Sequence, residues 1–543
     1  MPKLARRNLI AAARSISLSI TLHFPSARAV HFELNRDHAT TMTHGDRLLQ
    51  SVIHRLLSPG AAIPRTQHEM FSTQHRPFEG LLDLQKGWPS ARLCARKQIC
   101  NGVEDVLAEG NDMTPILGYG PSQGYAPLRN EIAKWLSDVY ALSAEPTEAS
   151  RICVTNGASA SLANVVLKFT DPSYTRRVFM VEPTYFLACP IFEDCGFRGR
   201  LQGVPEGSQD GIDLDFLLNE LSKTESESGW PDQPATKTGV SYPHVYKYVL
   251  YCTTTFANPS AKTMPPDVRE RLVEIARAFD ILLISDDVYD FLSWPASDSL
   301  VEDSMDFLPA RLVDIDRSLP GTTPYGNAIS NGSFSKIVGP GIRVGWVEAQ
   351  PDLVMQLAQI GSSRSGGNPA HFASTIVEHM LRTGSLQSHI SDVAIPEYHM
   401  RYYVYMKAVE ELLIPLGYVD EAPKHTSGIA GGFFSYLRTP RIFAENRVYA
   451  RDLAAIALRD YNLRVAFGHM FVIAGDAGSL QRAELKDGFG YCIRLCWAWM
   501  ETGEILEALN RLADCSKTIR AKLEIGEDVT AGLSPKAYLD INS

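Results

Sequence analysis

The sequence predicts an α/β protein with a mainly parallel sheet covered by helices on both faces, followed by a smaller α+β domain. From about residue 150 to 350, short apolar runs such as "RICVT", "YKYVLYC" and "ILLIS" alternate with helical segments. After about residue 395 the pattern changes to one long helical segment and several short strand-like ones. At 543 residues the chain also exceeds the size of a single core, so two or more lobes are expected.

The composition excludes several classes of protein. Hydrophobic residues make up 45% of the chain, and the formal net charge of -10 argues against a nucleic-acid partner. No apolar run is long enough to cross a bilayer, so no membrane partner is predicted. The nine cysteines show no paired CxxC spacing, so we expect reduced thiols and no metal site.

Residues 1–42 form a basic N-terminal extension. The first 32 residues contain five lysines and arginines but no Asp or Glu, and their Ser-rich and Ala-rich composition resembles a mitochondrial presequence. The stretch Ala27–Ala29 also permits a secretory signal, and a disordered extension before a start at Met42 is the third alternative. We expect a cytoplasmic protein, with a mitochondrial location as the alternative.

Residues 43–115 are expected to form an N-terminal arm and part of the small domain. A helix-like "RLLQSVIHRLL" begins at about Asp46, and the later segment "LLDLQKGWPS" is typical of an extended arm. The large domain is predicted over residues 116–395. Its first helix, in "GYGPSQGYAPLRNEIAKWLSDVY", has apolar residues at helical spacing, namely Leu128, Ile132, Trp135 and Leu136.

The predicted strands of the large domain place polar residues at one edge of the sheet. In such sheets ligands bind at the carboxyl ends of the strands. The residues that fall there are Gly157, Asn258, Asp286 and Lys336. A C-terminal small domain is predicted over residues 396–515, with a polar tail over residues 516–543.

The segment "SFSKIVGPGIRVGW" resembles the lysine segment of the class I/II aminotransferases, which are pyridoxal-phosphate enzymes of fold type I. The motifs are most similar to those of the kynurenine/2-aminoadipate aminotransferase branch, and they extend in order over roughly residues 80 to 515. The resemblance implies a large domain with a mainly parallel seven-stranded sheet, a smaller α+β domain and pyridoxal 5'-phosphate as the cofactor.

Three catalytic residues follow from this resemblance. Lys336 takes the place of the lysine that holds the cofactor as a Schiff base and then moves a proton. Asp286, in "DDVY", meets the pyridine nitrogen, where a carboxylate keeps the ring protonated and able to accept electrons. Tyr289 meets the phenolic oxygen, whereas Asp287 is expected to be an ordinary turn residue.

A phosphate site is implied at two places. Ser333, Ser335 and Arg343 supply hydroxyl groups and a planar guanidinium fork. Backbone N–H groups at a helix N-terminus are expected at Gly157, Ala158 and Ser159. Without the resemblance, the same "TNGAS" segment is also typical of a capped turn.

Other positions match residues around the cofactor ring and between subunits. Tyr185, in "EPTYF", matches the aromatic residue on the ring face, and Asn258, in "FANPS", donates to the phenolic oxygen. Tyr119, in "GYGPSQG", matches the tyrosine that reaches the phosphate of a neighbouring subunit. A homodimer with shared active sites is therefore implied.

The substrate residues are implied in the arm and the small domain. Arg494, in "YCIRLCW", matches the arginine that binds the substrate α-carboxylate, and Gly87, in "LQKGWPS", matches the arm over the same substrate, beside Asn258. Phe467 stands where many relatives carry proline, so the side-chain pocket is undefined.

The predicted function is transfer of an amino group between an α-amino acid and a 2-oxo acid. A carbon–sulfur lyase or a 1-aminocyclopropane-1-carboxylate synthase-like enzyme would keep the same residues. A ligand-sensing transcription regulator is a remote alternative, because residues 42–80 show no second recognition helix.

Overall fold

The computed structural model describes residues 19–22, 30–33, 80–142, 145–207, 211–295, 308–422 and 429–533. It divides into two units, Met1–Ser72 and Thr73–Ser543. In the first unit, β1 (Ser19–Leu22) pairs antiparallel with β2 (Val30–Glu33). The helix predicted from about Asp46 lies outside the described residues.

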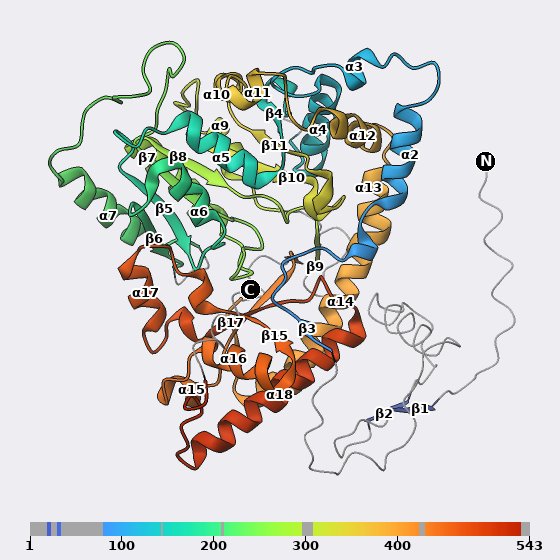
Figure 1. Cartoon of the computed structure of the whole chain (residues 1–543), viewed down its shortest axis with the longest axis vertical. Helices are drawn as coiled ribbons and strands as arrows, with labels where there is room; N and C mark the ends of the chain where they lie inside the picture. The colour runs from blue at the N-terminus through green and yellow to red at the C-terminus, as the bar shows by residue number, and fades with distance from the viewer. Residues whose placement is uncertain are drawn as a thin grey trace, which may run out of the picture. The chain divides into compact units, whose positions relative to one another are not determined.

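A seven-stranded sheet forms the centre of the large domain (Figure 1), with the strand order β4-β11-β10-β8-β7-β5-β6. Its strands are β4 (Ile152–Thr155), β5 (Arg177–Glu182), β6 (Leu201–Pro205), β7 (Tyr248–Cys252), β8 (Ile281–Ser285), β10 (Ala328–Ser333) and β11 (Gly345–Glu348). Of these seven, β11 is antiparallel to both neighbours and the others share one direction. The prediction of a mainly parallel seven-stranded sheet is confirmed.

Helices cover both faces of this sheet because its strands are apolar on both sides. In β5, Val178 and Met180 pack with the helices of one face, and Phe179 packs with those of the other. The first face carries α5 (Ala158–Phe169), α6 (Ala188–Phe192) and α10 (Pro351–Leu357). The second face carries α7 (Leu214–Ser226), α8 (Pro266–Phe279) and α9 (Leu312–Ser318).

A further group of helices includes α4 (Ala126–Val139), which packs against the edge strand β4 of this sheet. The other members of the group are α2 (Arg96–Val106), α3 (Thr114–Leu117), α11 (Gly361–Arg364), α12 (His371–Arg382) and α13 (Ser385–His389). The four apolar residues predicted to face the core from α4 are buried. No described helix combines the length and apolarity that crossing a membrane requires.

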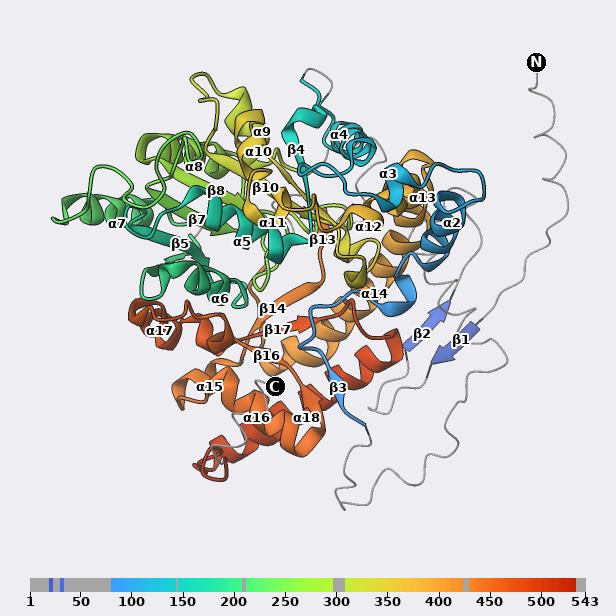
Figure 2. The ribbon, with the colours of Figure 1, turned by 45° about the horizontal axis from the view of Figure 1, so that its top comes forward.

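The small domain is a four-stranded sheet with helices, and Figures 1 and 2 show its helices gathered at one end of the unit. The strands are β12 (Val419–Asp420), β14 (Phe434–Arg438), β16 (Ala466–Phe467) and β17 (Cys492–Cys496). The helices are α14 (Ile395–Ala408), α15 (Arg441–Glu445), α16 (Ala450–Tyr461), α17 (Ala477–Glu484) and α18 (Thr502–Glu524). Because α18 continues beyond residue 515 and buries Ile519, the polar tail predicted from residue 516 cannot begin there.

The arm is attached to the small domain through its backbone. Strand β3 (Leu82–Asp83) pairs parallel with β15 (Leu463–Arg464), and the Cys496 N–H donates to the Leu84 carbonyl at 2.8 Å. A second short pair joins β9 (Ser293–Pro295) to β13 (Ile429–Gly431).

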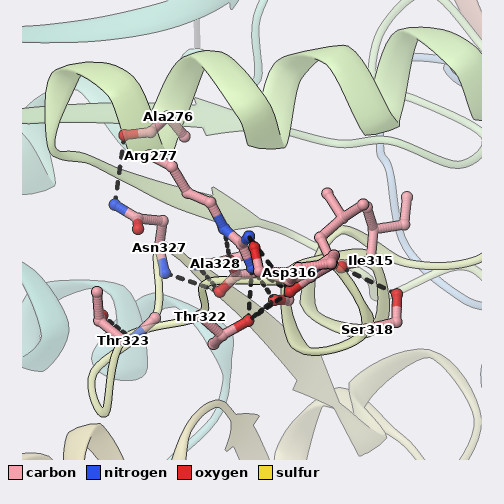
Figure 3. Close-up of polar contacts among 12 residues, drawn as sticks. Ala276, Arg277, Ile315, Asp316, Ser318, Thr322, Thr323, Asn327 and Ala328 are labelled. Atoms are coloured by element: carbon pink, nitrogen blue, oxygen red, sulfur yellow. Dashed lines mark hydrogen bonds and ion pairs between the residues drawn. The ribbon is translucent and has the colours of Figure 1, made fainter.

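A buried carboxylate fixes the start of β10, the strand that leads to Lys336 (Figure 3). Asp316, at the end of α9, accepts from Arg277 Nε at 2.9 Å and from the Asn327 N–H at 2.8 Å. Asn327 Nδ2 donates to the Ala276 carbonyl of α8 at 3.3 Å. These contacts bind α8 and α9 to β10. The segment that contains Lys336, from the end of β10 to the start of β11 (residues 333–344), is called the lysine loop.

Candidate active site

Lys336 lies in the turn after β10, with its ammonium group turned toward the arm. Its Nζ donates to the Gly87 carbonyl at 2.9 Å and lies 5.7 Å from the ring centroid of Tyr289. Burial lowers the pKa of Lys336 to about 8, although Cys496 and Asp286 act in the opposite direction. A larger fraction of this amine is therefore neutral near pH 7 than for an exposed lysine.

Asp286 directly follows β8 and is held from two neighbouring strands. Tyr251 donates to its Oδ2 at 2.8 Å, and Asn331 Nδ2 donates to its Oδ1 at 3.1 Å. Burial raises the pKa of Asp286 to about 6, against the effect of these hydrogen bonds. Asp287 instead accepts hydrogen bonds from Ser285 and from Ser330, so its carboxylate is occupied within the fold.

Arg494 points from β17 toward the arm and the large domain. Its Nη1 donates to Asn258 Oδ1 at 2.8 Å, and its Nη2 donates to the Gln85 carbonyl. Burial lowers the pKa of Arg494, and its Nε has no partner among the described residues. Its two hydrogen-bond partners are uncharged, and no carboxylate of the described residues forms an ion pair with this buried guanidinium, which leaves it suited to an anionic ligand.

The N-terminus of α5 meets the arginine of the lysine loop. Gly157 has φ +88°, and a Cβ there would lie 2.6 Å from Arg343 Nη2. Arg343 donates to the backbone carbonyls of Asn156 and Pro340, each at 3.1 Å. Ala158 and Ser159 begin α5 beside this contact.

The two serines of the lysine loop lie next to one another. Ser333 Oγ donates to Ser335 Oγ at 2.9 Å and accepts from the Ser335 N–H at 3.1 Å. Asn331 Nδ2 also donates to the Ala158 carbonyl at 3.1 Å, which connects the start of α5 to Asp286.

Of the three tyrosines expected at the site, two lie in it. Tyr289 is buried and Tyr185 is partly buried, and both interact electrostatically with Asp286 and Arg494. Tyr119 lies on the surface with 93% of its side chain exposed, so it does not reach the site of its own chain.

Comparison with known proteins shows the family. A profile of the family described as aminotransferase class I and II matches residues 95–405, which is more than half of the chain. The uncharacterized protein YER152C of Saccharomyces cerevisiae is 33% identical over 443 residues, covering 77% of this chain and 93% of the yeast protein. The chain belongs to the class I and II aminotransferase family. This aminotransferase is an enzyme that transfers amino groups with pyridoxal phosphate as its cofactor.

Two proteins that are less similar in sequence also match this chain. The 2-aminoadipate transaminase of Thermus thermophilus is 25% identical over 463 residues, covering 84% of this aminotransferase and 94% of that protein. The crystal structure of the Pyrococcus horikoshii kynurenine aminotransferase superposes with a TM-score of 0.62 at 21% identity, covering 87% of this chain and 99% of that one. The second comparison shows the shared fold.

The residues present in this aminotransferase fit pyridoxal phosphate. Arg343 has only backbone carbonyls as partners among the described residues, so its charge is available for a phosphate. The lack of space for a Cβ at Gly157 shows how closely the backbone approaches that charge. Asp286 supplies the buried carboxyl that a pyridine nitrogen requires. Lys336 supplies the amine that an aldehyde requires, with a pKa lowered to about 8.

Several residues at the site were not predicted from the sequence. Asn331 and Tyr251 hold Asp286, and Phe433 and Phe434 lie beside Lys336 and Arg494. Asn331 lies within β10, five positions before Lys336 in "SNGSFSK", so its proximity to the lysine could be predicted from the sequence, but its contact with Asp286 could not. Tyr251 was not recognisable, because only the parallel register of β7 and β8 brings it next to Asp286.

Proposed function

We propose that this aminotransferase acts on α-amino acids through Lys336, Asp286, Tyr289 and Arg494. The observation that carries the proposal is the convergence of Lys336, with its lowered pKa, the buried carboxyl of Asp286 and the buried guanidinium of Arg494. They meet where the large domain, the small domain and the arm come together, and Arg494 has no ion-pair partner among the described residues. Arg494 binds the α-carboxylate with its planar fork, after releasing Asn258 and the Gln85 carbonyl. This orients the substrate amine toward Lys336.

The chemistry divides between cofactor and chain. Bound pyridoxal phosphate supplies an aldehyde and an electron-accepting ring. Asp286 would hold a proton on the ring nitrogen, while Tyr289 and Asn258 would provide hydrogen bonds at the phenolic oxygen. Lys336 Nζ takes a proton from the substrate Cα and would deliver it to the C4' carbon of the cofactor, because its lowered pKa makes both the protonated and the neutral amine accessible. Ser333, Ser335, Arg343 and the start of α5 would hold the phosphate, and Tyr185 would stack on the ring.

We propose amino acids with large aromatic or apolar side chains as the amino donors. The guanidinium of Arg494 lies 4.4 Å from the ring centroid of Phe434 and 5.4 Å from that of Phe471, and Lys336 lies 5.6 Å from that of Phe433. These rings offer apolar surface beside the bound carboxylate. The named relatives act on kynurenine and on 2-aminoadipate, so a panel with both tests the proposal. We expect kcat/KM for phenylalanine or kynurenine to exceed that for 2-aminoadipate by about tenfold or more.

The role of Arg494 is tested with Arg494→Lys, which keeps the charge but loses the fork. KM should rise for every α-amino acid together, whereas half-reactions with amines that lack a carboxylate should change little. Equal losses for both kinds of amine would show that the role of Arg494 is structural.

The reaction type is tested by the products of the parent enzyme. Release of ammonia with a thiol or pyruvate, without formation of the pyridoxamine form, would indicate lyase chemistry.

We further propose that the enzyme is a homodimer in which Tyr119 serves the partner's phosphate, an assignment supported by its exposed position. The cytoplasmic location stays a prediction. Imaging a tagged full-length chain beside one that starts at Met42 tests it against mitochondrial import.

A further inference from the structure

A cavity with a volume of about 420 Å³ lies between α4, β9 and the helices α13 and α14. Its described lining residues include none of the proposed catalytic, cofactor or substrate residues. Asp290, which lines it, directly follows Tyr289. One part of the cavity wall is therefore the segment that directly follows Tyr289, and its described lining side chains differ from those of the active site.

Aromatic rings form much of the cavity wall. Trp135 and Phe291 stack with ring centroids 4.1 Å apart, and Trp294 lies on the same wall. Trp294 is itself fixed by stacking with His399 at 5.6 Å and by an edge contact with Trp497 at 5.7 Å. These rings give a small ligand a preformed apolar surface.

Three buried polar atoms of the lining have no hydrogen-bond partner among the described residues. They are Asp290 Oδ1, Trp294 Nε1 and Gln387 Oε1. The other polar atoms of the two acceptor side chains are held: Asp290 Oδ2 accepts from Tyr140 at 2.7 Å, and Gln387 Nε2 donates to the Leu381 carbonyl at 3.1 Å. Since buried polar atoms are nearly always paired, these two acceptors and one donor indicate a missing polar partner.

The charge of the lining has one sign. Asp290 and Asp138 contribute carboxylates, and no lysine, arginine or histidine is found among the described lining residues. Asp290 is only 1% exposed, and burial together with Asp287 raises its pKa to about 7, although Arg269 and Arg311 oppose this from outside the cavity. A cation in the cavity would stabilise the Asp290 carboxylate, and aromatic faces also attract cations.

We propose that this cavity is a binding site for a small apolar amine in its protonated form. The ammonium N–H donates to Asp290 Oδ1, and the apolar part lies against Trp135, Phe291 and Trp294. Gln387 Oε1 and Trp294 Nε1 remain available to further polar groups of the ligand. The site is independent of the transamination reaction proposed above.

The test uses N,N-dimethyl-2-phenylethylamine, a tertiary amine that cannot condense with the cofactor aldehyde, and its neutral analogue 2-phenylethanol. Calorimetric titration of the full-length holoenzyme near neutral pH should show one amine per chain, bound about tenfold more tightly than the alcohol. Asp290→Asn keeps an acceptor for Tyr140 but removes the charge, so this preference should disappear. Asp392→Asn, at an exposed acid outside the lining, should leave it unchanged.

Ile390→Phe provides a second test, because it adds side-chain volume at the cavity wall and leaves Asp290 in place. Binding of both probes should weaken by about tenfold or more, while the cofactor absorbance stays that of the parent. Equal affinity for amine and alcohol in the parent would overturn the proposal. So would amine binding that is unaffected by both variants, or no saturable binding at all, which would indicate a cavity filled by water. Because neither probe reacts, these outcomes do not depend on whether transamination is observed.

Discussion

At the scale of single residues, Lys336 and Asp286 show how burial prepares two groups in opposite directions. The same loss of solvent lowers the pKa of the amine to about 8 and raises that of the carboxyl to about 6. Each of these pKa values therefore lies within about two units of pH 7, where a group can both donate and accept a proton.

Cofactor capture by the apoenzyme should follow the ionisation of Lys336. Only the neutral amine attacks an aldehyde, so the rate of covalent attachment should rise about tenfold per pH unit and level off above about pH 8. Stopped-flow absorbance measures this rate. A rise that continues to pH 10 would show an unshifted lysine. In Lys336→Ala, borohydride should no longer fix the cofactor to the chain.

The two neighbouring aspartates should behave differently when each is replaced by asparagine. Asp286→Asn removes the carboxylate proposed at the ring nitrogen, so kcat should fall by about a hundredfold or more. Asp287→Asn disturbs hydrogen bonds with Ser285 and Ser330, so it should lower the free energy of unfolding by about 1–3 kcal/mol with little change in kcat. Steady-state kinetics and urea unfolding of both variants separate the effects, and equal losses of kcat would contradict the assignment.

Single site residues that directly follow a strand could be predicted from the sequence, but the residues that hydrogen-bond to them could not. Asp286 and Asn258 follow apolar runs, and that pattern is local. Tyr251 and Asn331 reach Asp286 across strands that are distant in sequence, so their contact depends on sheet order and register. No local pattern carries that information.

At the scale of elements, the arm is held from both sides. Gly87 faces inward, with its carbonyl on Lys336, while the outward-facing Trp88 packs edge-on against Trp499 with ring centroids 5.3 Å apart. Lys86 Nζ lies 5.2 Å from the Trp88 ring centroid and 5.4 Å from that of Trp499. The arm is therefore positioned by contacts that the motif "KGWP" alone does not reveal.

Gly87→Ala should disturb this position. The added Cβ would lie 2.9 Å from Phe434 Cζ and 3.9 Å from Arg494 Nη1, so the arm or the ring must shift. We expect kcat/KM for amino acids to fall by about tenfold or more, because small displacements at a substrate site are costly. Gly503→Ala, where a Cβ meets nothing within 4 Å, is the matched control. Unchanged kinetics in Gly87→Ala would show that the arm does not cover the substrate.

The start of β10 depends on Asp316, so Asp316→Asn should destabilise the enzyme. Arg277 would lose its buried carboxylate partner, which typically costs about 3 kcal/mol. Urea unfolding measures the loss. Asp460→Asn, at an exposed pair with Arg459, should change stability by less than about 1 kcal/mol. Similar values for the two variants would mean that the contacts in Figure 3 do not fix the strand.

At the scale of the whole molecule, the two lobes and the sheet were predictable from the sequence, because strand-like apolar runs alternate with segments that have the apolar spacing of a helix. The extent of α18 was not, because charged residues on its exposed side made residues 516–524 resemble a tail, although Cys515 and Ile519 are buried. The attachment of the arm was also hidden. Strands β3 and β15 have two residues each and lie far apart in sequence, so pairing them requires the folded small domain.

Assembly is tested by combining two defective subunits. If Tyr119 serves the partner's phosphate, Tyr119→Phe should weaken cofactor retention by about fivefold, the effect of one hydrogen bond. A hybrid of Tyr119→Phe and Lys336→Ala subunits then has one site with both native residues and one with neither. At limiting cofactor, purified hybrids should be more active than either parent dimer, since the native site combines the lysine of one chain with the tyrosine of the other. If Tyr119 served its own chain, each hybrid site would keep one defect, and activity would not exceed the average of the two parents.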